Sequence, residues 1–164
     1  MAIRLTKIVC ILAGLMLLPM ALANTSDGEG KVFPNTEQMK KALSAMGFDQ
    51  PWNMTEGGEK QALNNGELWV RDGHYFAVMA VHDDNEQTMQ VSLINNLSIC
   101  AQLGIAATGD SSKSVFSAFT HLTGKALNKP ETTAFNERTP FHYHVLITEM
   151  IAESTLMQCG VKNQ

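Results

Sequence analysis

The residues best suited to chemistry in this chain are two histidines separated by one position, His142 and His144. Alternate side chains lie on one face of a strand, so both imidazoles would stand close enough to share a metal ion. Zinc needs at least three protein ligands, and neutral imidazoles suit it. A third ligand would have to come from elsewhere in the chain: His74, His82, His121 or Glu149. The competing interpretation, which we favour, is that the pair lies on the solvent face of an amphipathic strand.

No segment carries a catalytic motif, and we expect no cofactor. Gly109-Asp110-Ser111-Ser112 is similar to the Gly-Asp-Ser block of one esterase class, but the late Asp-x-x-His that completes such a site is missing. Ser111 stands where a helix cap is needed, which is the better explanation. Thr123-Gly124-Lys125 lacks the preceding glycine of a phosphate loop. The acidic stretch 82–86 lacks the glycine and the closing glutamate of a calcium loop.

The N-terminus predicts export. Arg4 and Lys7 precede an uninterrupted apolar run over residues 8–18, and Ala21-Leu22-Ala23 provides the small residues that a signal peptidase accepts. The run is about half of the roughly 20 residues that span a bilayer, so residues 1–23 are a cleaved signal peptide rather than an anchor. We expect no later stretch to be long and apolar enough to cross a membrane. We expect a soluble protein in a bacterial periplasm or secreted from the cell.

Removal of the signal makes the protein more acidic. The whole chain has 12 Lys and Arg against 16 Asp and Glu, and the signal holds two of the basic residues and no acidic one. The mature chain then has a net charge of −6, which argues against nucleic acid and anionic membranes as partners. Such a surface suits solubility, or a protein partner with a basic patch.

Two cysteines remain after cleavage, Cys100 and Cys159. An even pair in an exported domain predicts a disulfide, and the Cys-x-x-Cys spacing of a redox-active pair is absent. We therefore expect a structural bridge that closes a long loop and ties the chain end to the middle of the fold.

The first half of the mature chain predicts a helix and a hairpin. Residues 24–34 are polar with two glycines and end in proline, as in a flexible leader. A helix follows, with Asn35 and Gln38 as a capping box and Gly47 at its end. Residues 48–66 look irregular. Residues 67–71 and 74–81 then form a hairpin across Asp72-Gly73, a pair typical of a type I′ turn, and the second strand is apolar enough to be central and buried on both faces.

The second half continues the sheet. Alternating apolar residues predict a third strand over 87–94, and residues 95–108 are helix or strand. Asp110 or Ser111 caps a helix that Gly124 ends, and a polar connector runs over 125–140. Residues 141–148 form a strand, and the tail to Cys159 returns as another. The predicted class is α+β, a single domain over residues 35–164 in which an antiparallel β-meander packs with two or three helices.

These observations favour a small exported protein-binding module, of the kind that inhibits an envelope enzyme or neutralises a toxin. The basis is an analogy of type, because small acidic exported domains with one disulfide and no catalytic signature are often binders. An envelope hydrolase with a non-contiguous site is the first alternative. A carrier of a metal or small ligand that uses His142 and His144 is the second. The sequence leaves oligomeric state and partner open.

Overall fold

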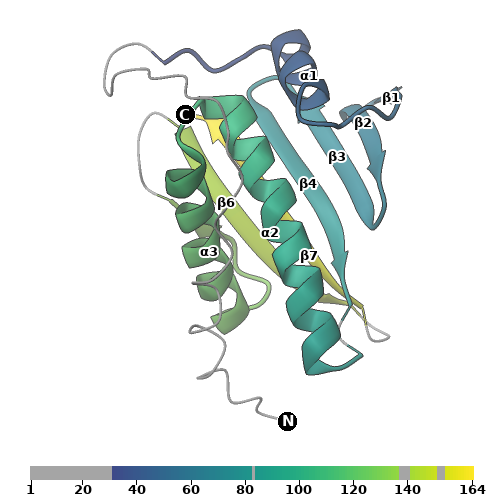
Figure 1. Cartoon of the computed structure of the whole chain (residues 1–164), viewed down its shortest axis with the longest axis vertical. Coiled ribbons are helices and arrows are strands. Elements are labelled where there is room, and N and C mark those ends of the chain that lie inside the picture. Colours follow the sequence, from purple (N-terminus) through teal and green to yellow (C-terminus); the bar gives the residue numbers. More distant parts are fainter. Residues whose placement is uncertain (1–30, 83, 137–140, 151–153) are drawn as a thin grey trace.

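Seven antiparallel strands form one sheet, and the helices of the described chain pack on one of its faces (Figure 1). The computed structural model describes residues 31–82, 84–136, 141–150 and 154–164; the predicted signal peptide lies outside these ranges. The elements in chain order are α1 (Thr36–Ser44), β1 (Trp52–Thr55), β2 (Gly58–Leu63), β3 (Gly66–Arg71), β4 (His74–Val81), α2 (Glu86–Thr108), α3 (Ser112–Asn128), β5 (Ala134–Phe135), β6 (Phe141–Met150) and β7 (Ser154–Asn163).

The predicted α+β class is confirmed. The first four strands follow one another as a meander, and the chain then leaves the sheet to form α2 and α3. It returns at the far edge, so the strand order is β1-β2-β3-β4-β7-β6-β5. The last strand, β7, therefore pairs with β4 in the middle of the sheet. This long-range pairing joins the two halves of the chain.

The predicted hairpin is present, with a different turn. Arg71 pairs with His74, so the connection is two residues long, as expected from Asp72-Gly73. Only Gly73 has a positive φ, 69°, whereas a type I′ turn needs positive φ at both central residues. The second strand, β4, is central as predicted. On the side away from the helices, Phe76 is buried while His74 and Val78 are half-buried, so the expected burial on both faces holds only in part.

The predicted third strand over 87–94 is wrong: this segment is the first part of the 23-residue helix α2, which also contains the ambiguous residues 95–108. Asn85 and Thr88 form a capping box that starts the helix. The apparent two-residue alternation arises because Val91 lies on the solvent side, while Leu93 and Leu97 face the sheet at helical spacing. The burial of α2 follows the helical repeat from Ser92 to Thr108, which three alternating apolar residues did not reveal.

Two other segments differ from the prediction. Residues 48–66 contain the hairpin β1–β2, whose strands carry few apolar residues because they lie at the edge and are largely half-buried or exposed. Gly124 does not end α3, which runs on to Asn128, and the connector after it includes the short strand β5. Gly124 has open space around it and an ordinary helical backbone, so tertiary packing carries the helix through it.

The start of the domain agrees with prediction at α1. Asn35 and Gln38 form the predicted capping box, and Gly47 takes a positive φ of 93° beyond the helix. The end of the predicted leader is held in place, because Phe33 stacks on Tyr75 and the Tyr75 hydroxyl donates to the carbonyl of Pro34. Residues 24–30 lie outside the described chain.

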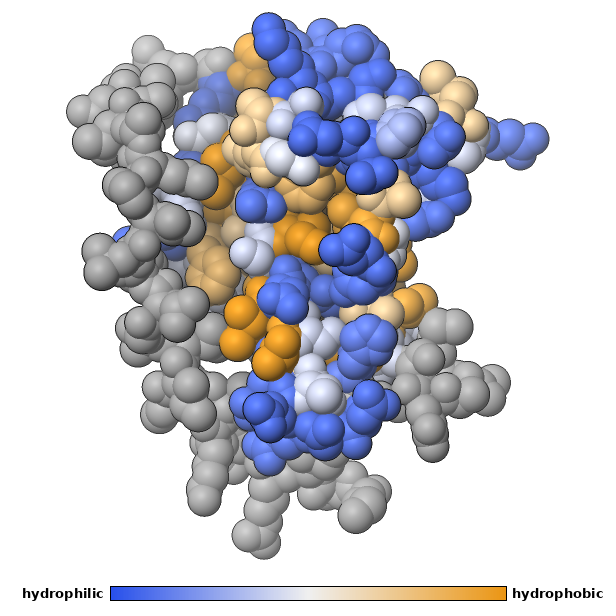
Figure 2. Space-filling model, turned by 45° about the vertical axis from the view of Figure 1, so that its right-hand side comes forward, coloured by the Kyte–Doolittle hydropathy of each residue, from blue (hydrophilic) through white to orange (hydrophobic). Residues whose placement is uncertain are grey.

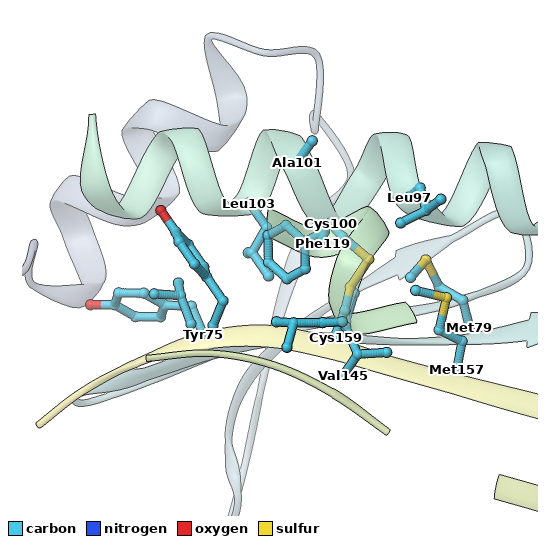
Figure 3. Packing of buried hydrophobic residues seen from close by; sticks show 14 of the residues in the cluster. Tyr75, Met79, Leu97, Cys100, Ala101, Leu103, Phe119, Val145, Met157 and Cys159 are labelled. Atoms are coloured by element: carbon cyan, nitrogen blue, oxygen red, sulfur yellow. A yellow bond between two sulfur atoms is a disulfide. The ribbon is translucent and has the colours of Figure 1, made fainter. Parts of the chain in front are cut away.

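The core fills the space between the helices and the sheet (Figure 3). The helix α2 is long and apolar enough to cross a membrane by length and composition, contrary to the expectation from sequence. More than half of its apolar window is buried inside the protein, where Leu97 and Leu103 contact side chains from the sheet and α3. Its apolar character is therefore explained by its place in the core.

The predicted disulfide is present between Cys100 of α2 and Cys159 of β7, with the two Cα atoms 5.8 Å apart (Figure 3). Both residues are fully buried. The bond closes a span of 59 residues that includes α3 and β6, and it joins the two layers of the domain near the middle of α2.

Reduction of this disulfide is expected to lower the free energy of unfolding by roughly 4 kcal/mol, because the bridge restricts the unfolded chain. Urea unfolding of the oxidised protein, with and without reductant, measures the loss. Equal midpoints under both conditions would contradict a structural role for the bridge.

Two glycines in the helices offer a matched test of the packing between α2 and α3. A Cβ on Gly104 would lie 2.5 Å from Val115 Cγ1 and 2.9 Å from Phe119 Cε2, whereas one on Gly124 meets nothing within 4 Å. Gly104→Ala is expected to destabilise the protein by about 1–3 kcal/mol through overpacking. Gly124→Ala is expected to stabilise it by about 0.5–1 kcal/mol. Thermal unfolding of both variants measures these changes in stability. A Gly104→Ala variant as stable as the unaltered protein would mean that α2 and α3 lie farther apart than described.

Candidate functional site

A hollow runs along the N-terminal half of α2, and we call it the α2 groove. It encloses about 1180 Å³ and is open to solvent. One wall is α2 itself, and the other is formed by the segment after α1 and by the β2–β3 turn. Its lining residues are Gly47, Phe48, Asp49, Gln50, Gln61, Ala62, Leu63, Asn64, Asn65, His82, Asp84, Gln87, Thr88, Val91, Ser92, Asn95 and Ile99.

A buried glutamine holds the outer wall of the groove. The Gln61 side chain is only 1% exposed, and its Nε2 donates to the carbonyls of Phe48 and Gln50. These bonds attach the segment after α1 to β2. The other amide atom, Gln61 Oε1, is buried without a hydrogen-bond partner in the described chain. Since an unpaired buried acceptor costs stability, its presence beside a hollow marks a place that a donor could satisfy.

Two further polar side chains fix α2 against the sheet at the floor of the groove. Asn96, fully buried, donates from Nδ2 to the carbonyl of Ala80 over 3.0 Å, and its Oδ1 accepts from Asn65 Nδ2 over 2.8 Å. The Ser92 hydroxyl accepts from the amide of His82 over 3.1 Å. Neither Asn96 nor Ser92 was singled out from the sequence, although polar residues at the core positions of an apolar helix could have drawn attention.

The surface chemistry of the groove combines apolar and acidic groups. Val91 and the adjacent Ile94 are 53% and 44% exposed on α2. Figure 2 shows apolar surface gathered in the middle of this side of the molecule, with hydrophilic residues above and below it. The charged residues that line the groove in the described chain are the carboxylates Asp49 and Asp84, with no lysine or arginine among them. Apolar side chains within an acidic rim form the kind of patch that monomeric proteins use for recognition.

The histidines predicted as a metal pair lie on the same strand, β6, but have different neighbours. His142 Nδ1 lies 3.1 Å from the carbonyl of Asn136 and donates to it, because a carbonyl only accepts. His144 is 5% exposed, and its Nε2 lies 3.4 Å from Nε2 of His74. No cluster of three or more His, Cys, Asp or Glu suited to a metal ion occurs in the described part of the chain. Metal binding by His142 and His144 stays a prediction, and the described residues supply no third ligand to the two histidines.

The contact between His74 and His144 depends on a glycine in the strand between them. A Cβ at Gly160 of β7 would lie 2.6 Å from His144 Cε1, so only glycine leaves room for the ring. The pairing was missed from the sequence because His74 lies 70 positions before His144. Burial, followed by the charges of His74 and Lys162, lowers the pKa of His144 to about 3. Burial, followed by Arg71 and Lys162, also lowers the pKa of His74.

The segment similar to an esterase block serves as a helix start. Ser111 is the N-cap of α3, and its hydroxyl accepts from the amide of Ser114 over 3.4 Å. Among the described histidine side chains, His74 is hydrogen-bonded to His144, and His142 is hydrogen-bonded to a backbone carbonyl. The hydrolase hypothesis needs a hydrogen bond from a histidine to a serine or carboxylate side chain, and no such bond occurs among these residues.

No protein-family model, curated protein or solved structure matches the chain. The function is therefore inferred from the surfaces of the molecule itself.

The buried histidine pair predicts acid sensitivity. An unfolded histidine has a pKa near 6.5, so below that pH the unfolded chain takes up a proton that His144 in the folded protein does not accept until about pH 3. Stability is then retained above pH 6.5 and lost as the pH falls below it. Between pH 7 and pH 5, we expect a loss of roughly 2 kcal/mol from His144.

Urea unfolding at pH 7 and pH 5 measures this loss. His144→Gln should reduce the difference between the two pH values, and His121→Gln, on the exposed surface of α3, serves as the control. An unchanged pH difference in His144→Gln would show that the acid sensitivity comes from other groups.

Proposed function

We propose that the protein is an exported protein-binding module that recognises its partner through the α2 groove. The observation that carries the proposal is the combination of exposed Val91 and Ile94 with an acidic rim at Asp49 and Asp84. About half of each side chain is already buried, so covering the rest against a partner contributes roughly 1 kcal/mol each, and the two together reach the scale of one interface hot spot.

The chemistry of the groove favours a partner that presents apolar side chains together with lysine or arginine. A cation entering the groove would meet carboxylates and no competing lysine or arginine from the described lining. The unpaired Oε1 of Gln61 is an acceptor at the same place, and a small shift of the wall would expose it to a donor. Carboxylates at the rim also steer a basic partner toward the groove before contact.

The predicted export signal and the disulfide suit a role in a periplasm or outside the cell, where an inhibitor of an envelope enzyme or a toxin-neutralising protein acts. Both roles need tight recognition and no catalysis by the binder. The groove walls are held by buried hydrogen bonds from Gln61 and Asn96, which lowers the ordering cost of binding.

The test begins with capture of partners from the envelope and secreted fractions of the source organism by the oxidised protein. A partner that forms a stoichiometric complex is then titrated against groove variants. Val91→Lys, which places a cation in an apolar part of the groove, should weaken binding at least tenfold. The double variant Asp49→Asn/Asp84→Asn should slow association and reduce its dependence on salt.

Met54→Lys is the matched control, because Met54 is an exposed apolar residue on β1 that does not line the groove. It should leave binding unchanged. A partner held equally well by Val91→Lys and by Asp49→Asn/Asp84→Asn would contradict recognition through the groove. An absence of any stoichiometric protein partner would contradict the proposed function itself.

A further inference from the structure

The face of the sheet opposite the helices carries a line of four basic residues, which we call the basic row. The register aligns Arg71 of β3 with His74 of β4, His74 with Lys162 of β7, and Lys162 with His142 of β6. Four neighbouring strands therefore each contribute one basic side chain at the same level. In the described chain no helix covers this face, since the helices pack on the opposite side.

The two permanent cations of the basic row are not ion-paired in the described chain. Neither Arg71 nor Lys162 forms a salt bridge there. Lys60, on the same face, is paired with Glu67 over 2.6 Å. Asp72 lies in the turn beside the row and makes no salt bridge there. The positive charges of Arg71 and Lys162 are thus left without an ion-pair partner among the described residues.

The same charges act on the two histidines that lie beside them. Arg71 and Lys162 add to burial in lowering the pKa of His74, and Lys162 and His74 do so for His144. The groups that face this pair in the described structure are Arg71 from β3, Lys162 from β7 and His142 from β6. None of them is acidic; the carboxylates of Glu56, Glu59 and Asp72 line a hollow beside Arg71, at the β3 end of the row.

Aromatic rings support the two permanent cations. The Arg71 guanidinium carbon lies 5.4 Å from the centre of the Phe76 ring, and Lys162 Nζ lies 5.1 Å from the centre of the Phe135 ring. The side chain of each is thereby held on the sheet without a hydrogen bond to another described side chain, so the N–H donors stay available. Gly160 lies between the two rings in the register and adds no side chain of its own.

We propose that the basic row is a binding site for a phosphoryl group. The two permanent cations match a dianion, and the fork of Arg71 donors fits two phosphoryl oxygens. His74 and His142 stand on either side of Lys162 in the register, and His74 can take up a proton in the bound state. Two permanent charges are too few for a nucleic-acid backbone, which needs many phosphate contacts to bind. The phosphoryl group can belong to a soluble ester or to a lipid headgroup.

The test uses the oxidised, exported protein and two probes, inorganic phosphate and sulfate. Titration followed by nuclear magnetic resonance should shift the signals of the basic row and leave the α2 groove unchanged. The double variant Arg71→Gln/Lys162→Gln should weaken binding of both anions at least tenfold. The control is the double variant Lys113→Gln/Lys125→Gln, which replaces two lysines on the exposed side of α3. This variant should bind both anions as tightly as the unaltered protein does.

Sulfate isolates the role of His74, because the charge of sulfate is constant between pH 6 and pH 8. Sulfate affinity should rise as the pH falls toward 6, since a bound dianion favours a proton on His74, and His74→Gln should lose that rise. A lack of saturable binding to either anion, or equal binding by Arg71→Gln/Lys162→Gln, would overturn the proposal. In the case of binding, capture by vesicles of phosphatidic acid and not of phosphatidylcholine identifies a lipid headgroup as the source. Binding of phosphate without vesicle capture identifies a soluble ester.

Discussion

The packing of α2 across β4 and β7 is the contact on which the rest of the structure depends. The pairing of β4 with β7 joins the N-terminal meander to the C-terminal strands, and α2 lies over that junction. Cys100 and Cys159 link the helix covalently to the same place. A helix that is apolar on nearly every side is stable in water only when most of it is covered, and here the sheet, α1 and α3 provide the cover.

Both candidate surfaces follow from this one-sided arrangement. The α2 groove lies between α2 and the β2–β3 turn, where the other helices do not cover α2. On the opposite face of the sheet, no helix of the described chain packs. The two surfaces have opposite character. The groove combines apolar, amide and hydroxyl side chains with the carboxylates of Asp49 and Asp84, while Arg71 and Lys162 of the basic row form no salt bridge among the described residues. The acidic net charge of the chain, −4, therefore conceals a face that carries basic side chains on four neighbouring strands.

Much of the fold could be predicted where the signal is local. The capping box at Asn35, the two-residue hairpin connection and the strands after residue 141 depend on neighbouring residues, and all are present. The strand predicted over 87–94 failed because Val91 is apolar yet exposed, so its side chain imitated alternation. The edge hairpin β1–β2 was missed because hydrogen bonding to β3 forms it, with little apolar patterning of its own.

The sequence by itself determined the α+β class, the disulfide and the absence of a local catalytic motif, because each depends on composition or on short spacings. Only the tertiary structure decided which distant side chains meet. His144 contacts His74 across the space left by Gly160, and Asn96 holds the β3–β4 hairpin through Asn65 and Ala80. Strand register and helix packing set these contacts, and both arise from the burial of the whole apolar surface at once. The charge of a surface is likewise decided by which strands become neighbours, not by the order of residues along the chain.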